Sequence, residues 1–408
     1  MQASARGALP APSNPEDQQY QDVAPTPDGA DIAAIGAPSL LDEESELGPG
    51  QYVFLMVLVI VGVLTGIAFA NHSLTPLIYQ EPAQAEVART LHNGQNYALY
   101  DLNFEIRGVR RHQIRLMTKT PELIILGASH WQEAHAGLVP GVDFFNAHVH
   151  RDYYDDPIGM VGHLLDYNRL PKTLVISVRD ATFTPVAERT DYLWLGGIPS
   201  FRAMEPRLGL PKRPWYEDYH LQPVLDLFSL RLAITGGLRE LRATNRPGPT
   251  DADFAEDLDI FMADGSIRWS GEHLAAFTPE YVRDRALEMA QHMRRHPPRI
   301  NADTVDAFRR MLALLQNHDV DVVLAHPPFN PQFHDAVAGS DYADHLNAVE
   351  ALTRDLAAQY GARTAGSFDP ARVGCTADMY IDSEHSRPVC LQKLLAQVVS
   401  GRSQAPSL

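Results

Sequence analysis

One uncharged apolar run near the N-terminus constrains this chain more than any other sequence feature. Residues 52–70 read YVFLMVLVIVGVLTGIAFA, and none of these side chains is charged. As an α-helix that rises about 1.5 Å per residue, the run would span roughly the hydrocarbon core of a bilayer. Polar sequence directly before the run argues against a buried core helix. We therefore expect residues 51–71 to form one transmembrane anchor.

A cleavable signal peptide is the main alternative for the same run. Ala68-Phe69-Ala70 fits the small-residue pattern of a cleavage site. However, the apolar run is long, and the segment before it is acidic where a signal peptide carries basic residues. We therefore expect an uncleaved anchor. Its orientation is not specified by the flanking charges, because the nearest basic residue after the run is Arg89.

Composition separates the N-terminal tail from the rest of the chain. Residues 1–50 are rich in Pro, Ala, Gly, Asp and Glu. Such a segment buries too little apolar surface to fold, so it is predicted to be a disordered, acidic, Pro-rich tail. The whole chain has a net charge of −17, which makes nucleic acid an unexpected partner.

Beyond residue 120, apolar runs of strand length alternate with runs of helical spacing. Residues 72–120 have mixed charge and are predicted to form a helical connector. Expected strands lie at 122–126, 144–146, 173–178 and 320–324, and expected helices at 158–165, 305–315, 342–360 and 389–399. This alternation predicts an α/β domain over residues 121–408 with a parallel sheet covered on both faces. The pattern is lost at about 184–298, which we interpret as an irregular insertion.

The first expected strand ends at a small-residue turn that carries a serine. Gly127-Ala128-Ser129-His130 follows Leu126, and a helix is expected from Trp131. A serine at such a turn exposes its Oγ, and its own backbone N–H points toward the same spot. Ser129 is therefore the candidate nucleophile and also a candidate oxyanion-hole donor.

A candidate general base lies near the other end of the domain. In Asp382-Ser383-Glu384-His385, an aspartate three positions before a histidine can accept the Nδ1–H hydrogen bond and leave Nε2 free to take a proton from a serine. Solvent-exposed loop side chains are the alternative reading of this motif. Together with Ser129, the motif predicts a Ser-His-Asp triad.

The only two cysteines bracket this motif. Cys375 precedes Asp382 and Cys390 follows His385. We predict a disulfide that closes a small ring around the base, which would contribute roughly 3 kcal/mol in an oxidising compartment. Two buried free thiols are the alternative.

These blocks resemble the SGNH, or GDSL-type, hydrolase superfamily. Its members place the serine after the first strand and Asp-x-x-His before the last helix, in a three-layer fold around a parallel sheet. The resemblance implies that Asn146 lies where a second block supplies a donor, and that Arg179 occupies the position of the oxyanion-hole asparagine. Arg387, two residues after His385, is a further substrate-contact candidate.

Within that superfamily, the architecture is similar to membrane-anchored proteins of bacterial polysaccharide O-acetylation, related to the alginate acetylation proteins. This similarity implies an O-acetyltransferase in the periplasm, held by one helix in the inner membrane. Its partners would be a glycan acceptor and a membrane-bound O-acyltransferase as acyl donor, and it would need no cofactor. A periplasmic carbohydrate esterase that removes acetyl groups uses the same residues and is the first alternative.

Two other classes of function are also compatible with the sequence. A zinc metallohydrolase would use His148 and His150, which share a face if they lie on a strand, with His130, Glu133 and His135 nearby in sequence. Against this, the chain contains 17 histidines, so incidental pairs are expected. A non-catalytic glycan-binding protein with an SGNH-like fold is the last alternative, because the oxyanion-hole asparagine is replaced.

Overall fold

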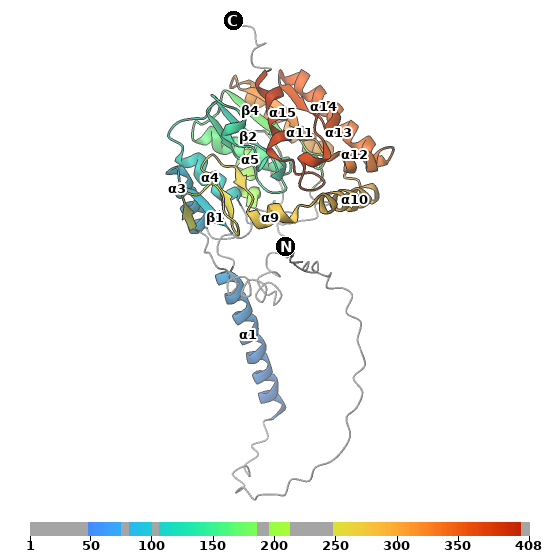
Figure 1. Cartoon of the computed structure of the whole chain (residues 1–408). Helices are drawn as coiled ribbons and strands as arrows, with labels where there is room; N and C mark the ends of the chain where they lie inside the picture. The colour runs from blue at the N-terminus through green and yellow to red at the C-terminus, as the bar shows by residue number, and fades with distance from the viewer. Residues whose placement is uncertain (1–47, 75–80, 100–105, 186–195, 213–247, 401–408) are drawn as a thin grey trace, which may run out of the picture. The chain divides into compact units, whose positions relative to one another are not determined.

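The computed structural model describes residues 48–74, 81–99, 106–185, 196–212 and 248–400 (Figure 1). The predicted disordered tail falls almost entirely outside these residues. Helix α1 (Pro49–Leu74) coincides with the predicted anchor. Its segment Pro49–Ala70 is long and apolar enough to cross a membrane, and none of it is buried inside the protein. The chain therefore carries a candidate single-pass membrane helix near its N-terminus.

A five-stranded parallel sheet organises the globular part of the chain. Its strands, in spatial order, are β3 (Phe144–Asn146), β2 (Leu123–Leu126), β4 (Thr173–Ser177), β8 (Asp321–His326) and β9 (Arg363–Gly366). The predicted α/β class with a parallel sheet is confirmed. The chain first adds β3 on one side of β2 and then β4 on the other, so the strand order reverses there. Sites in such sheets form at the carboxyl ends of strands beside this reversal.

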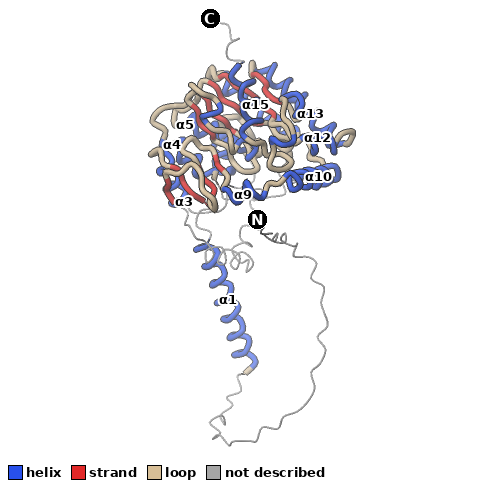
Figure 2. The backbone as a smooth tube through the Cα atoms, viewed as in Figure 1, coloured by secondary structure: helices blue, strands red, loops and turns tan. Residues whose placement is uncertain are grey.

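Helices pack on both faces of this sheet, because alternate side chains of each strand point to opposite faces. Ile124 and Leu126 belong to one core cluster, and Leu123 and Ile125 to the other. The first cluster includes residues of α5 (Asp155–Asp166), α11 (Ala302–Gln316) and α13 (Asp341–Tyr360). The second includes residues of α15 (Pro388–Ser400). In Figure 2, α5, α13 and α15 are labelled near the strands, which are drawn in red.

A second, antiparallel sheet has the order β5-β1-β6-β7. Its strands are β1 (Asn96–Leu99), β5 (Gly248–Thr250), β6 (Asp259–Phe261) and β7 (Ile267–Arg268). The predicted helical connector over residues 72–120 contains α3 (Glu81–His92) and α4 (Arg107–Leu116), with β1, which was not predicted, between them. The partners of β1 lie far along the chain, in the predicted insertion, so local sequence could not reveal the pairing.

The insertion is partly regular in its described residues. It contains α6 (Ile198–Met204), α9 (Gly271–Ala276) and α10 (Pro279–Arg295) besides β5, β6 and β7. Among the described residues, the remaining short elements are α12 (Pro331–Val337), α14 (Pro370–Val373) and the 3₁₀-helices η1 (Ser129–Trp131), η2 (Ala136–Leu138) and η6 (Ala377–Met379). Strand β9 was not predicted, because its four residues, RTAG, have no apolar run.

Candidate active site

Ser129 lies directly beyond the carboxyl end of β2, on a turn that only glycine permits. A Cβ atom on Gly127 would lie 2.6 Å from Ser177 Cβ and 2.8 Å from Trp131 Cδ1. The strand therefore turns in close contact with β4 and with the fully buried Trp131. The helix expected from Trp131 is absent, and η1 and η2 form a compact nucleophile loop in its place.

Asn146 and β7 fix this nucleophile loop, here defined as residues 129–138. Asn146 Nδ2 donates hydrogen bonds to the carbonyls of Trp131 (2.6 Å) and Ala134 (2.8 Å). The Ile267 N–H donates to the carbonyl of Gln132 at 2.7 Å. Asn146 is fully buried with both amide hydrogens engaged, so it holds the loop instead of offering a donor to an oxyanion.

The three predicted triad residues lie in one hydrogen-bonded chain. His385 Nε2 is 2.8 Å from Ser129 Oγ, and His385 Nδ1 is 2.6 Å from Asp382 Oδ2. Both distances fall within the range for hydrogen bonds. One imidazole nitrogen is thus hydrogen-bonded to a carboxylate and the other to a hydroxyl. This is the arrangement that a general base needs to take the serine proton.

His385 lies on a loop, here defined as residues 380–386 and called the base loop. Hydrogen bonds to the backbone of this loop hold it in place. Asp382 Oδ1 accepts the backbone N–H groups of Glu384 and His385, each at 2.8 Å. Asn330, at the start of α12, donates from Nδ2 to the Asp382 carbonyl at 2.9 Å. Its own N–H donates to the Ser383 carbonyl at 3.0 Å. The general base therefore has a fixed position in a segment without regular secondary structure.

Charges around His385 favour its protonated form. Burial alone would lower the pKa of His385, but the charge and hydrogen bond of Asp382, followed by the charge of Glu384, raise it to about 9. Burial raises the pKa of Asp382, and its interactions with His385 outweigh this and lower it overall. Because only the neutral imidazole can accept a proton, alkaline conditions favour proton transfer from Ser129.

Ser129 and His385 open into a cavity of about 900 Å³. Beside the triad, its wall carries Arg179, Asp180 and Glu384. The insertion supplies an aromatic wall, defined as Trp269, His273, Phe277 and Tyr281, whose neighbouring ring centroids lie 5.4–6.4 Å apart. The cavity therefore joins a charged reaction centre to a ring-lined surface.

The two arginines predicted as substrate contacts differ in their positions. Arg179 lines the cavity, 3.7 Å from Asp152 and 3.9 Å from Asp180, and among the described residues its Nε has no hydrogen-bond partner. Arg387 is not among the lining residues, and its Nε donates to the Tyr380 carbonyl at 3.2 Å. Arg387 therefore braces the base loop, whereas Arg179 faces the cavity into which Ser129 and His385 open.

The histidines of the zinc alternative do not form a ligand set. His148 Nδ1 lies 3.0 Å from the Arg110 guanidinium, and burial together with that charge holds the pKa of His148 well below its usual value. A guanidinium at this distance opposes a metal cation at the same nitrogen. In the described part of the chain, no group of three or more His, Cys, Asp and Glu residues could hold a metal ion.

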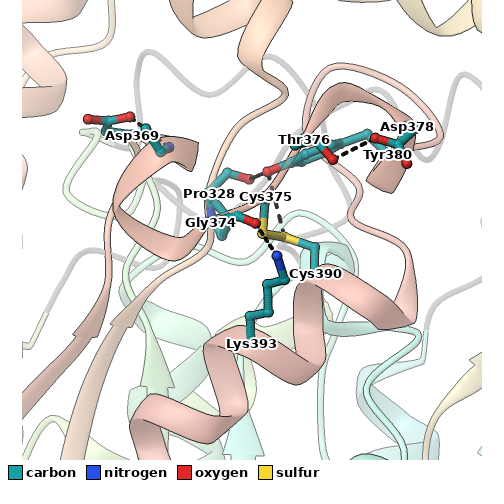
Figure 3. The surroundings of a disulfide bond; sticks show 10 residues. Pro328, Asp369, Gly374, Cys375, Thr376, Asp378, Tyr380, Cys390 and Lys393 are labelled. Atoms are coloured by element: carbon teal, nitrogen blue, oxygen red, sulfur yellow. Dashed lines mark hydrogen bonds between the residues drawn. A yellow bond between two sulfur atoms is a disulfide. The ribbon is translucent and has the colours of Figure 1, made fainter.

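The cysteines form the predicted disulfide, Cys375–Cys390, with its Cα atoms 5.4 Å apart (Figure 3). Cys390 lies in the first turn of α15, and Cys375 follows α14. Between them, the hydroxyl of the buried Tyr380 lies 3.7 Å from Cys390 Sγ and donates to the Pro328 carbonyl at 3.3 Å. The bond thus ties both ends of the segment that carries the base loop to packed structure.

Two residues beside the triad were given no role in the predicted serine site. His130 Nε2 lies 3.2 Å from Glu384 Oε2. The only sequence signal for them is their position, one directly after Ser129 and the other directly before His385. No spacing rule links residues so far apart, so their contact appears only in the folded chain.

No protein-family profile matches the chain, and no curated protein matches it. The chemistry of the site must therefore be argued from its own geometry.

The first prediction concerns the disulfide. The variant Cys375→Ala/Cys390→Ala should lose up to roughly 100-fold in reaction rate with a fluorophosphonate, since a misplacement of about 1 Å can cost that much. Its free energy of unfolding should fall by about 3 kcal/mol or less, because the sheet core is untouched. Both quantities can be measured on the full chain in detergent. An unchanged labelling rate would contradict the role of the ring.

Proposed function

We propose that this chain is a membrane-anchored serine acyl-ester enzyme that transfers an acetyl group to an exported polysaccharide. The observation that carries the proposal is the hydrogen-bonded chain from Ser129 through His385 to Asp382. The strand order and the helices on both faces of the sheet support an SGNH-like three-layer domain as its scaffold.

The proposed reaction has two steps through one covalent intermediate. His385 Nε2 takes the Ser129 proton while Oγ attacks the acyl carbonyl carbon of the donor ester, and the same proton then passes to the departing alcohol. In the second step, an acceptor hydroxyl gives its proton to His385 and attacks the acyl carbonyl. Ser129 leaves and takes that proton back. With water as the acceptor, the same steps describe an esterase.

Two groups are proposed to stabilise the oxyanion of each tetrahedral intermediate. Among the described residues, the Ser129 N–H has no hydrogen-bond acceptor, so it is available to the substrate. Arg179 lines the same cavity and holds a permanent positive charge, since its neighbouring carboxylates raise its pKa against the effect of burial. A guanidinium in place of an asparagine amide would supply both a donor and a charge.

The aromatic wall supports a sugar as the acceptor. Aromatic faces carry partial negative charge and attract the slightly positive C–H groups of a pyranose ring. Tyr281 is 41% exposed, and the rings line the same cavity as Ser129. His273 is oriented by a 2.8 Å contact with the buried Asp259, which leaves polar groups at the edge of this wall.

The α1 helix and the disulfide support a location outside the cytoplasm. Structural disulfides persist in oxidising compartments such as the bacterial periplasm, and one helix is enough for a single-pass anchor. A tethered enzyme also gains effective concentration of a membrane-bound acyl donor and of a polymer leaving the membrane.

Ester turnover tests the reaction directly. Ser129→Ala and His385→Ala should each lower turnover of 4-nitrophenyl acetate by several powers of ten, because each removes a triad member. His148→Ala is a matched histidine control outside the triad and should keep turnover of the folded enzyme. A rate that survives Ser129→Ala, or that a chelator abolishes, would contradict the serine mechanism.

Acceptor kinetics test the aromatic wall. Phe277→Ala and Tyr281→Ala should each raise the KM for an oligosaccharide acceptor roughly three- to tenfold, since each removes about 1 kcal/mol of stacking. Hydrolysis of 4-nitrophenyl acetate should stay unchanged. Tyr167→Ala removes an exposed tyrosine outside the cavity and serves as the control. If no oligosaccharide in a panel of neutral and acidic sugars accepts the acetyl group while water does, the esterase reading replaces transfer.

The compartment is tested by trapping thiols in intact cells. Alkylation before lysis should leave Cys375 and Cys390 unmodified and joined in one non-reduced peptide. Alkylated cysteines in the folded, membrane-bound chain would place the domain in a reducing compartment.

A further inference from the structure

The nucleophile loop and the base loop are joined twice. Ser129 and His385 make the first link, and their sequence neighbours His130 and Glu384 make the second, with Nε2 and Oε2 3.2 Å apart. We propose that His130–Glu384 is a positioning pair, which holds the two loops in register and sets, through the charge of Glu384, the pH at which His385 accepts the serine proton. This inference rests on the proposed function of the triad.

Packing holds His130 beside the imidazole that it would position. The His130 side chain is 2% exposed, and its ring centroid lies 5.6 Å from that of His385 with the planes tilted by 33°. Phe329 meets the same ring edge-on at 6.4 Å. Among the described residues, His130 Nδ1 has no hydrogen-bond partner, so the contact with Glu384 is the polar contact that orients this ring.

Glu384 is partly buried beside His130 and Asp382. Its side chain is 28% exposed, and its own N–H donates to Asp382 Oδ1. Burial opposes ionisation, but the charge and hydrogen bond of His130 and the charges of His385 and Arg179 hold the pKa of Glu384 far below its usual range. Glu384 therefore stays ionised while His385 titrates.

The charged and titratable groups around His385 come from three segments. They are Asp382 and Glu384 on the base loop, Arg179 after β4, and His130 and Glu133 on the nucleophile loop. The two base-loop carboxylates stabilise the imidazolium and Arg179 opposes it. Removing the charge of Glu384 must therefore make His385 easier to deprotonate. The acid limb of the pH–rate profile then moves to lower pH.

Two substitutions separate the charge of Glu384 from its contact. Glu384→Gln keeps the size and an acceptor oxygen for His130 but removes the charge. Glu384→Ala removes both. Glu122→Gln removes an equal charge from an exposed pair with Lys172 and is the matched control.

Each variant is measured in two ways as the full chain in detergent. NMR of histidine-labelled protein, with the His385 signal assigned through His385→Gln, follows the titration of His385 whether or not the enzyme turns over. Fluorophosphonate labelling follows the reaction, in which Ser129 Oγ bonds to phosphorus, its proton goes to His385 Nε2, and fluoride leaves.

The proposal expects Glu384→Gln to lower the titration midpoint of His385 by roughly one pH unit and to keep the alkaline plateau rate of labelling. Glu384→Ala should lower that plateau about tenfold, since the loops lose their second link. Glu122→Gln should change neither quantity. An unchanged His385 midpoint in Glu384→Gln, or an unchanged plateau in Glu384→Ala, would overturn the proposal. If the His385 titration midpoint shifts but fluorophosphonate does not label the chain, the serine chemistry alone is refuted. The electrostatic role of the pair is then still supported.

Discussion

The 2.8 Å hydrogen bond between Ser129 Oγ and His385 Nε2 is the contact on which the account of this protein depends. It joins residues 256 positions apart, so the two side chains are brought together by the fold of the domain and not by local structure. The sheet does this because Ser129 follows β2 at the point where the strand order reverses, the usual place of sites in open α/β sheets. The remaining features of the site either hold the two side chains in place or change the pKa of His385.

Contacts from several separate segments hold Ser129 and His385 in place. Asn146 and β7 fix the carbonyls of the nucleophile loop, while Asn330 and the disulfide fix the base loop. Two carboxylates beside His385 then raise its pKa, which makes it a stronger base. Rigid placement and charge tuning are thus separate requirements, and the His130–Glu384 contact is positioned to serve both.

The sequence predicted the parts of this structure that local patterns encode. The apolar run at α1, the short apolar runs at strands β2, β4 and β8, and the helical spacing in α11, α13 and α15 are each clear in the sequence, and the disulfide was predicted from two cysteines that bracket one motif. Local patterns did not reveal β1 and β9, because β1 depends on distant partners and β9 has no apolar run. The same limit applies to Asn146, whose amide serves the nucleophile loop instead of a substrate, and to the contact between His130 and Glu384.

Peptide mapping by mass spectrometry after fluorophosphonate treatment tests the central claim most directly, because it identifies the atom that reacts. The full chain should carry a single phosphonyl adduct on the peptide that contains Ser129, and the modification should disappear in the presence of denaturant, when His385 is no longer at 2.8 Å. An adduct on any other residue, or an unmodified Ser129 at a pH where His385 is neutral, would contradict the account.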